Sequence, residues 1–585
     1  MINAEVGGMR WSRGLAASTA LLSTFISAAP TPATPEMQVA IAASAIRTAV
    51  AASQWVVTAD GTRLATDVFL PLATGWGPWP VVIQRTPYGR GGATGSTCES
   101  LAFEGFACIA QDVRGTGDST GSNTVFRDDH SDGQATIEWV ARQWWCNGSV
   151  ATFGASALGM TQYALAPGAP DQLKCLVPMV ATADFFHHAA FWGGAIRYSL
   201  THPWLEGQGA LAFYDEMRSH RTWDAWWEQA AIMPHVGDIK VPGFHVGGWY
   251  DIFLQGTLDA FTAAQNRGGA GALGSQHLVV GPWVHTGVGT AQAGELTYPS
   301  NAANFVDVLA AVRDWYDHWL RGKTPAVEQW PAVHVYLMGA VGEAGAPGNV
   351  WLDLSAWPPP AVTTAFYLGT GRSLGIEQLP TGEIELRSDP GAPVPTVGGG
   401  NLFESVDGQL QGIGPLDQRP IEGRSDVLVF STPVLEEPVT VMGRVRCLVW
   451  VRPDTKDFDI AVRLADVYPD GRSMLVADGI QRARFRCGDD RECLADPGGP
   501  IEMTVDLWST ALAFNRGHRI RILISGSNWP RFEVNRNDGG DLNGAGAGVM
   551  ARPVVLVGSS FPSRLELPVL RVSQFPRRHL SRRRD

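Results

Sequence analysis

Short apolar runs alternate with helix-like segments over residues 54–183. Ser131-Asp132-Gly133-Gln134 has the pattern of a capping box, and the helix predicted after it carries Ile137, Val140, Ala141 and Trp144 at the spacing of one buried face. The runs predicted as strands are 66–70, 80–84, 106–112 and 150–153. This alternation predicts an α/β domain with a mostly parallel sheet flanked by helices.

Residues 184–239 interrupt that pattern with a helical segment that is rich in aromatic residues. We interpret it as a helical cap inserted into the α/β domain, with a purely structural helical subdomain as the alternative. The α/β pattern resumes over 240–350, with strands at 241–246 and 277–280 and an amphipathic helix at 305–319. The aromatic residues are Phe185, Phe186, Phe191, Trp192, Trp204, Phe213, Tyr214, Trp223, Trp226 and Trp227.

Helical patterns disappear from about residue 351 onward. The strand-like runs that follow are separated by Pro, Gly and Asp turns, at 363–368, 427–430, 439–451, 460–467, 501–507 and 518–524. This spacing predicts an antiparallel β-sandwich of jelly-roll type over residues 351–575. The first part of the α/β domain spans 51–183, and residues 576–585 are expected to be a disordered tail.

Composition narrows the class of protein. A chain of 585 residues is too long for a single core, so two or three domains are expected. The formal net charge of −12 argues against a nucleic-acid partner, whose binding face would be basic. The 22 tryptophans exceed what a core needs, which favours a wide apolar pocket for a small molecule.

The N-terminal residues 1–50 resemble a signal segment. Arg10 and Arg13 precede an apolar run at 14–29, which favours export; a disordered extension of a cytoplasmic protein is the alternative. No other stretch is long and apolar enough to span a membrane. The seven cysteines show no zinc spacing, and whether Cys487 and Cys493 form a disulfide or stay thiols is open.

The sequence Gly154-Ala155-Ser156-Ala157-Leu158-Gly159 follows a predicted strand and precedes a predicted helix. This is the context of a nucleophile elbow, in which a strained turn exposes a serine hydroxyl above the sheet. Ser119 fits the strict Gly-x-Ser-x-Gly pattern better, but no helix follows it, so a flexible loop is the better account of Ser119.

A serine nucleophile needs a histidine base and a carboxylate that orients the histidine. In α/β-hydrolases these follow in the order Ser, Asp or Glu, His, each on a loop after a strand. Asp251 and His285 meet that requirement. Taken singly, Asp251 could be a helix N-cap and His285 an ordinary loop histidine, but the three residues in this order predict a catalytic triad.

An oxyanion needs two hydrogen-bond donors. The backbone N–H of Ala157 is one candidate, and the phenol of Tyr88, on the loop after strand 80–84, is the other; a packing role for Tyr88 is the alternative. His187 and His188 lack a second pair of ligands, so we expect no metal site there. With neither a P-loop nor a dinucleotide fingerprint, the sequence predicts no cofactor.

Several motifs together resemble the cocaine esterase/X-Pro dipeptidyl-peptidase (CocE/NonD) family of serine hydrolases. They are Arg85-Thr86-Pro87-Tyr88, Asp112-Val113-Arg114-Gly115, Gly154-x-Ser156, Trp249-Tyr250-Asp251, Gly281-Pro282-Trp283-x-His285, Asp466-Val467-Tyr468-Pro469-Asp470-Gly471, Asp506-Leu507-Trp508 and Ser527-Asn528-Trp529-Pro530-Arg531-Phe532. The resemblance implies an α/β-hydrolase domain with a helical cap and a C-terminal jelly roll. It also implies Ser156, Asp251 and His285 as the triad, with Tyr88 and Ala157 as the oxyanion hole.

Departures from the family pattern bear on the substrate. The family usually has tyrosine where Ala157 stands, which alters the pocket beside the serine. Phe253 and Leu254 occupy positions where the amino-ester branch carries acidic residues, so the resemblance implies an ester with an apolar or aromatic acyl group; an X-Pro dipeptide or an amide is the alternative. We expect Phe253, Phe191 and Trp192 to line the pocket. A catalytically inactive binding protein is a further alternative for the function. Whether the chain forms a homo-oligomer also stays open.

Overall fold

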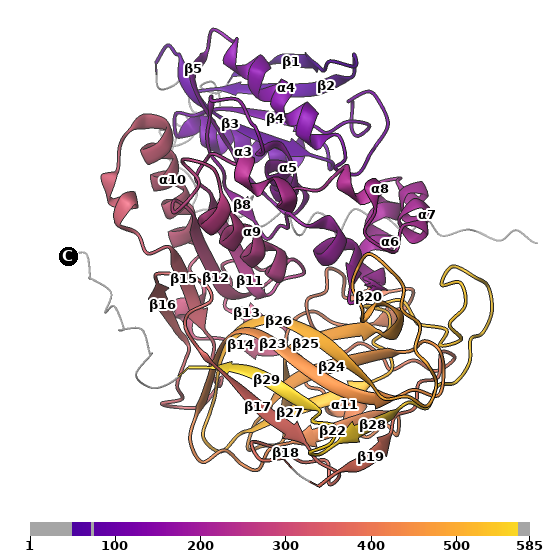
Figure 1. The fold of residues 1–585 in the computed structure, drawn as a ribbon. Coiled ribbons are helices and arrows are strands. Elements are labelled where there is room, and N and C mark those ends of the chain that lie inside the picture. The colour runs from indigo at the N-terminus through magenta and orange to yellow at the C-terminus, as the bar shows by residue number, and fades with distance from the viewer. Residues whose placement is uncertain (1–48, 72–74, 379, 571–585) are drawn as a thin grey trace, which may run out of the picture.

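The computed structural model describes residues 49–71, 75–378 and 380–570. The expectations for residues 1–48 and for the C-terminal tail fall outside these ranges. An α/β unit lies above a β-sandwich, and a small helical group projects at one side of the junction between them (Figure 1). The predicted fold class, an α/β-hydrolase domain with an inserted helical cap and a C-terminal β-sandwich, is confirmed.

The α/β unit is built on two six-stranded sheets that continue into each other. Their strand orders are β1-β2-β4-β3-β5-β7 and β16-β15-β12-β11-β8-β6, and β5 passes into β6 across Phe153 alone. The strands are β1 (Ala49–Val57), β2 (Arg63–Leu70), β3 (Trp79–Thr86), β4 (Ala107–Asp112), β5 (Cys146–Thr152), β6 (Gly154–Ala155), β7 (Leu173–Cys175), β8 (Pro178–Met179), β11 (Phe244–Tyr250), β12 (His277–Val284), β15 (Val333–Leu337) and β16 (Val350–Leu354).

The central strands pair in parallel, and the antiparallel pairs lie toward the two edges. Every residue of β3 and of β4 is buried, as expected for parallel strands covered on both faces. The helices that cover the sheet are α3 (Gly92–Phe103), α4 (Asp129–Ala141), α5 (Ala157–Leu165), α9 (Leu254–Arg267) and α10 (Phe305–Arg321). Helix α5 is buried along its whole length, so the element that follows the serine is held rigidly.

Two local predictions about α4 are wrong. The helix begins at Asp129, before the predicted capping box, and the Ser131 hydroxyl donates to the carbonyl of Asp128 instead of capping a helix. The helix also ends at Ala141, so Trp144 lies beyond it and is 70% exposed. Helical spacing does not extend past the end of a helix, and Trp145 is the tryptophan that packs into the core here.

The cap lies between β8 and β11 in the sequence. Its elements are a π-helical turn η4 (Phe186–Ala190), the hairpin β9 (Phe191–Trp192) and β10 (Ala195–Ile196), helices α6 (Tyr198–Gly207), α7 (Leu211–Ser219) and α8 (Ala225–Glu228), and the 3-10 helix η5 (Met233–Asp238). The cap has a small core of its own, in which Phe186 packs edge-on against Trp223 and Trp227.

The C-terminal sandwich consists of two antiparallel sheets. One has the order β18-β17-β29-β23-β28-β19, with β26 also paired to β23, and the other has the order β22-β27-β24-β25. The strands are β17 (Val362–Leu368), β18 (Leu374–Gly375), β19 (Gly382–Glu385), β22 (Val427–Ser431), β23 (Val439–Arg452), β24 (Asp459–Val467), β25 (Ser473–Arg482), β26 (Ile501–Phe514), β27 (Arg519–Ser525), β28 (Val554–Val557) and β29 (Arg564–Val569).

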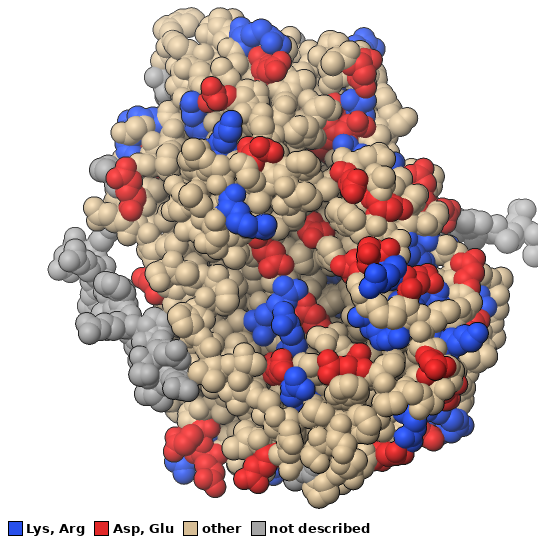
Figure 2. All heavy atoms as spheres, in the orientation of Figure 1, with Lys and Arg blue, Asp and Glu red and all other residues tan. Residues whose placement is uncertain are grey.

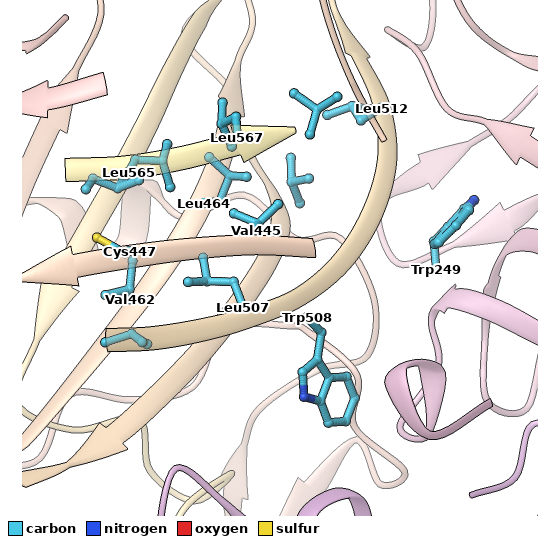
Figure 3. Packing of buried hydrophobic residues seen from close by; sticks show 14 of the residues in the cluster. Trp249, Val445, Cys447, Val462, Leu464, Leu507, Trp508, Leu512, Leu565 and Leu567 are labelled. Carbon is cyan, nitrogen blue, oxygen red and sulfur yellow. The ribbon is translucent and has the colours of Figure 1, made fainter. Parts of the chain in front are cut away.

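The sandwich and the α/β unit share one hydrophobic core. Figure 3 shows Val445, Val462, Leu464, Leu507 and Leu565 packed between the strands, while Trp508 projects away from them. Trp508 stacks on Trp192 of the cap with the ring centroids 3.7 Å apart, and Trp249 of β11 belongs to the same buried cluster. The sandwich is therefore packed as a fixed part of one unit with the α/β domain and the cap.

Covalent and surface features complete the fold. Disulfides join Cys98 to Cys108, which links α3 to β4, and Cys487 to Cys493, which closes a loop after β25.

Charged residues of both signs are interspersed over the face seen in Figure 2. Among the described residues, no helix is both long and apolar enough to cross a membrane.

Candidate active site

Ser156 lies on the sharp turn between β6 and α5. Its backbone has φ of 59° and ψ of −126°. Residues other than glycine rarely adopt this conformation, and it is found at strained functional positions. Gly154 permits the turn, because a Cβ at this position would lie 2.4 Å from the Cβ of Leu158. The geometry matches a nucleophile elbow. The second glycine that the turn requires is Gly159 rather than residue 158, because a Cβ at Gly159 would lie 2.5 Å from the Cβ of Ala181.

Ser156, His285 and Asp251 form a hydrogen-bonded chain. His285 Nε2 lies 2.9 Å from Ser156 Oγ, and His285 Nδ1 lies 2.5 Å from Asp251 Oδ1. Asp251 follows β11 and His285 follows β12, two adjacent parallel strands, so both side chains emerge at one edge of the sheet. This is the geometry by which a carboxylate fixes the tautomer of a histidine base.

Asp251 is held by the backbone around it. It is 2% exposed, and its second oxygen, Oδ2, accepts a hydrogen bond of 2.9 Å from the N–H of Phe253. Gly400, which follows β19 in the sequence, approaches the main chain so closely that a Cβ there would lie 3.0 Å from the Asp251 carbonyl oxygen. The C-terminal part of the chain therefore packs directly on the loop that carries the carboxylate.

Tyr88 stands on the loop after β3, two residues beyond Thr86. Burial raises the pKa of its phenol, while hydrogen bonds with the side chains of Trp204 and Ser156 oppose that shift, so the phenol keeps its proton at neutral pH. The N–H of Ala157 lies in the first turn of α5, where an N–H has no partner within the helix. Tyr88 and Ala157 therefore flank Ser156 as two available donors.

Ion pairs anchor the Tyr88 loop on both sides. Before it, Arg85 is buried and pairs with Asp129 at 2.6 Å. After it, Arg90 pairs with Asp112 at 2.7 Å, and its backbone N–H donates to the same carboxylate. These contacts give Arg85 of the first early sequence motif and Asp112 of the second a physical role, which is to fix the loop that carries the phenol.

Ser119 has no such partners. Its hydroxyl donates to the carbonyl of Asp112 at 2.7 Å and accepts from the N–H of Ala65 at 2.9 Å. Ser119 is buried in a turn, not in the flexible loop that the sequence predicts, and it serves to tie that turn to β2 and β4. The strict sequence pattern therefore marks a structural serine.

An apolar cavity opens beside Ser156. Arg127 is the one charged residue among the described residues that line it. The lining residues are Tyr88, Val125, Phe126, Arg127, Ser156, Ala157, Met160, Phe185, Ala189, Ala190, Leu200, Thr201, Trp204, Leu205, Phe213, Met217, Trp226, Trp227, Ala230, Ile252, Phe253 and Leu402. Such a cavity suits an apolar group attached to the carbon that the serine attacks.

The three predicted pocket residues have different positions. Phe253 lines the cavity and packs edge-on against His285, with ring centroids 5.6 Å apart. Phe191 and Trp192 are not among the described residues that line it, so the prediction that they line the pocket is wrong. Phe191 packs inside the cap core against Phe186, and Trp192 faces the sandwich, where Trp508 covers it.

Sequence reasoning missed Val125, Phe126 and Leu402 at the cavity. Phe126, from the hydrolase domain, is stacked between the rings of Phe185 and Trp204 at 5.1 and 5.9 Å. Val125 and Phe126 both have positive φ values, 48° and 69°, so this stacking holds a backbone conformation that is costly for residues with a Cβ. Leu402, which follows β19, also lines the cavity, and no sequence signal identified any of these residues.

Phe126 also separates this cavity from a second, more polar one. The second cavity shares Phe126, Arg127 and Ala230 with the first, and its other walls include His130, Glu228, His235 and Asp238. Within the described ranges, no group of three or more His, Cys, Asp or Glu side chains is arranged to hold a metal ion. His187 instead bridges Asp184 and Asp489, at 2.8 Å to each.

Two family models match the chain. The model of the X-Pro dipeptidyl-peptidase (S15 family) matches residues 60–212 and 204–287, and that of the X-Pro dipeptidyl-peptidase C-terminal non-catalytic domain matches residues 325–566. Cocaine esterase of Rhodococcus sp. (strain MB1 Bresler) is 31% identical over 594 residues, which cover 89% of this chain and 99% of that protein.

Solved structures share the fold at lower identity. An aminopeptidase from the marine sediment archaeon Thaumarchaeota archaeon has a TM-score of 0.77 and an α-amino acid ester hydrolase has a TM-score of 0.76. Each is 23% identical, and each match covers 90% of this chain and 97% of the solved chain. The family models, the sequence identity over most of the chain and the fold agree, and the chain belongs to the cocaine esterase/X-Pro dipeptidyl-peptidase family of serine hydrolases.

Proposed function

We propose that this serine hydrolase cleaves carboxylic esters with an apolar acyl group through an acyl-enzyme intermediate. The observation that carries the proposal is the hydrogen-bonded chain from Ser156 through His285 to Asp251 at the mouth of an apolar cavity. The nucleophile, the base and the oxyanion donors are all groups of the protein, so the proposed reaction needs no cofactor or metal.

In the proposed mechanism, Ser156 Oγ attacks the ester carbonyl carbon as His285 Nε2 takes its proton. Asp251 stabilises the imidazolium that forms. The oxyanion accepts hydrogen bonds from the Tyr88 phenol and the Ala157 N–H. When the C–O bond to the alcohol breaks, His285 returns the proton to the departing oxygen. A water molecule, deprotonated by His285, then releases the acid and restores the serine.

The lining of the cavity supports esters over amino-acid derivatives. A substrate ammonium buried there would need a carboxylate partner, but the charged lining residue is the cation Arg127. Phe253 contributes an aromatic face beside His285. Cleavage of X-Pro dipeptides or of amides is the second candidate function, and it rests on the family alone. A binding protein without activity is the least supported candidate because the triad geometry is complete.

An ester panel tests the proposal. We expect p-nitrophenyl esters of apolar acids to be hydrolysed with a kcat/KM at least 100-fold above that for X-Pro-p-nitroanilides. Ser156→Ala should lower kcat by about 10⁶-fold, whereas the control Ser119→Ala should leave the chemistry intact in any folded protein. Faster cleavage of the anilides would favour the peptidase, and a wild-type protein that a fluorophosphonate does not label at Ser156 would refute a hydrolase.

We also propose that the protein is exported to an oxidising compartment. The disulfides Cys98–Cys108 and Cys487–Cys493 support this location, since such bonds are rare in the reducing cytosol. The signal-like segment at residues 1–50 is the second support. Sequencing the N-terminus of the protein recovered from its native cells tests the proposal, and an intact N-terminus on cytoplasmic protein would refute it.

A further inference from the structure

Trp204 of the cap contacts the proposed oxyanion donor. It lies on α6, and its indole Nε1–H donates a hydrogen bond of 3.0 Å to the hydroxyl oxygen of Tyr88. Its ring is nearly parallel to that of Phe126, with an angle of 12° between the ring planes and 5.9 Å between the centroids. The position of the indole is therefore fixed by stacking as well as by the hydrogen bond.

The direction of this hydrogen bond is determined by chemistry. An indole N–H can only donate, whereas a phenol oxygen can accept while its own proton is donated elsewhere. Tyr88 must therefore be the acceptor, and its proton remains available for a second partner. Ser156 is the neighbour with which the Tyr88 hydroxyl also interacts, so the proton can point toward the reacting centre.

A donor that binds the phenol oxygen also changes its strength. Hydrogen bonds in a chain polarise each other, so a phenol that accepts from Trp204 becomes a better donor to an oxyanion. Burial raises the pKa of Tyr88 and keeps it protonated, and the Trp204 bond partly offsets that shift. The benefit is largest when the acceptor carries the full negative charge of the intermediate.

We propose that Trp204 is a positioning residue for the oxyanion hole: its indole N–H orients the Tyr88 hydroxyl toward the substrate oxygen and strengthens its donation in the transition state. The inference rests on the proposed role of Tyr88 in ester hydrolysis. It gives the cap a part in the rate of the reaction in addition to its part in forming the cavity wall.

The alternative role of Trp204 is that of a wall residue only. Trp204 lines the apolar cavity, so removing its ring would weaken substrate binding whatever its N–H does. Trp204→Phe separates the two roles because phenylalanine keeps an aromatic ring against Phe126 and loses the donor. Loss of a wall contact raises KM, whereas loss of an interaction made in the transition state lowers kcat.

A double-mutant cycle with Tyr88→Phe and Trp204→Phe tests the proposal. We expect Trp204→Phe to lower kcat five- to tenfold with KM within about twofold, the loss typical of one hydrogen bond. In the Tyr88→Phe background, Trp204→Phe should cause no further loss of kcat. Trp223→Phe is the matched control, since Trp223 is a cap tryptophan that packs against Phe186 and is not among the described residues that line the cavity; its kcat should stay within twofold.

Each outcome has a defined meaning. If Tyr88→Phe slows turnover and Trp204→Phe causes the same loss in both backgrounds, Trp204 acts independently of Tyr88 and the inference is overturned. If Tyr88→Phe leaves kcat unchanged, the proposed role of Tyr88 fails and the inference fails with it. Trp204→His retains an N–H donor, so it should recover part of kcat; it also provides a test if the phenylalanine variant does not fold.

Discussion

The wall between the two cavities gives a direct test of the proposal that the apolar cavity binds the acyl group of the substrate. Phe126 lines both the apolar cavity beside Ser156 and the polar cavity behind it. Its ring is held between Phe185 and Trp204. Phe126→Ala removes this ring and should join the two cavities, so that acyl chains can extend past the present wall.

The size of the effect follows from the apolar character of the first cavity. Burying one methylene group contributes about 0.8 kcal/mol, which is roughly fourfold in kcat/KM. If the opened wall admits two further methylenes, the preference for the longer ester should rise by about 1.6 kcal/mol, or roughly 15-fold. Further carbons should contribute less, because the second cavity is lined by polar groups such as His130 and Glu228.

The assay is kcat/KM for a series of p-nitrophenyl esters from acetate to decanoate. Phe213→Ala is the matched control, because Phe213 is also half-buried and lines the apolar cavity but not the second one. The control should change activity without moving the preferred chain length by two carbons. A folded Phe126→Ala enzyme with an unchanged preference would refute the partition, and so would an equal shift in Phe213→Ala.

Two further predictions concern stability and covalent structure. Burial raises the pKa of Glu533, but the positive charges of Arg482 and Arg221 outweigh burial and lower the pKa from 4.5 to about 2. These ion pairs therefore contribute about 3 kcal/mol to the free energy of unfolding above pH 4.5. The contribution is lost as the pH falls toward 2, because Glu533 then becomes protonated. Urea unfolding should therefore show Glu533→Gln to be less stable than the wild type at pH 7, with a gap that narrows below pH 4.5; a gap that does not depend on pH would contradict the ion pairs. Secreted protein alkylated in denaturant without reductant should gain three labels, and seven after reduction, in agreement with the free thiols of Cys146, Cys175 and Cys447. Labelling of all seven without reductant would contradict both disulfides.

The elements of the α/β domain could be predicted from the sequence because their signals are local. A buried parallel strand such as β3 is a continuous apolar run, and the elbow needs small residues within three positions of Ser156. Asp251 and His285 could be predicted because each directly follows such a strand, and adjacent parallel strands end at the same edge of the sheet. Their separation from Ser156 in the sequence does not matter, because the fold brings His285 within 2.9 Å of the Ser156 hydroxyl.

Local patterns failed where packing between distant segments decides the outcome. Helical spacing placed Trp144 on a buried face, but the helix ends at Ala141 and Trp144 is exposed. Phe191 and Trp192 lie in the same aromatic-rich segment as the cap residues that do line the cavity, and for that reason the sequence places them in the pocket. The sequence of the cap does not show which neighbour each aromatic ring will face.

The sequence by itself therefore determined the architecture and pointed to Ser156, His285 and Asp251 as the predicted triad, since periodicity and turn chemistry depend on neighbouring residues. Only the tertiary structure decided what surrounds Ser156. Phe126, Trp204 and Leu402 come from the hydrolase domain, the cap and the segment after β19, and they meet at one cavity through contacts over more than 70 residues of chain. Such contacts depend on shape complementarity between whole elements, which no local pattern in the chain records.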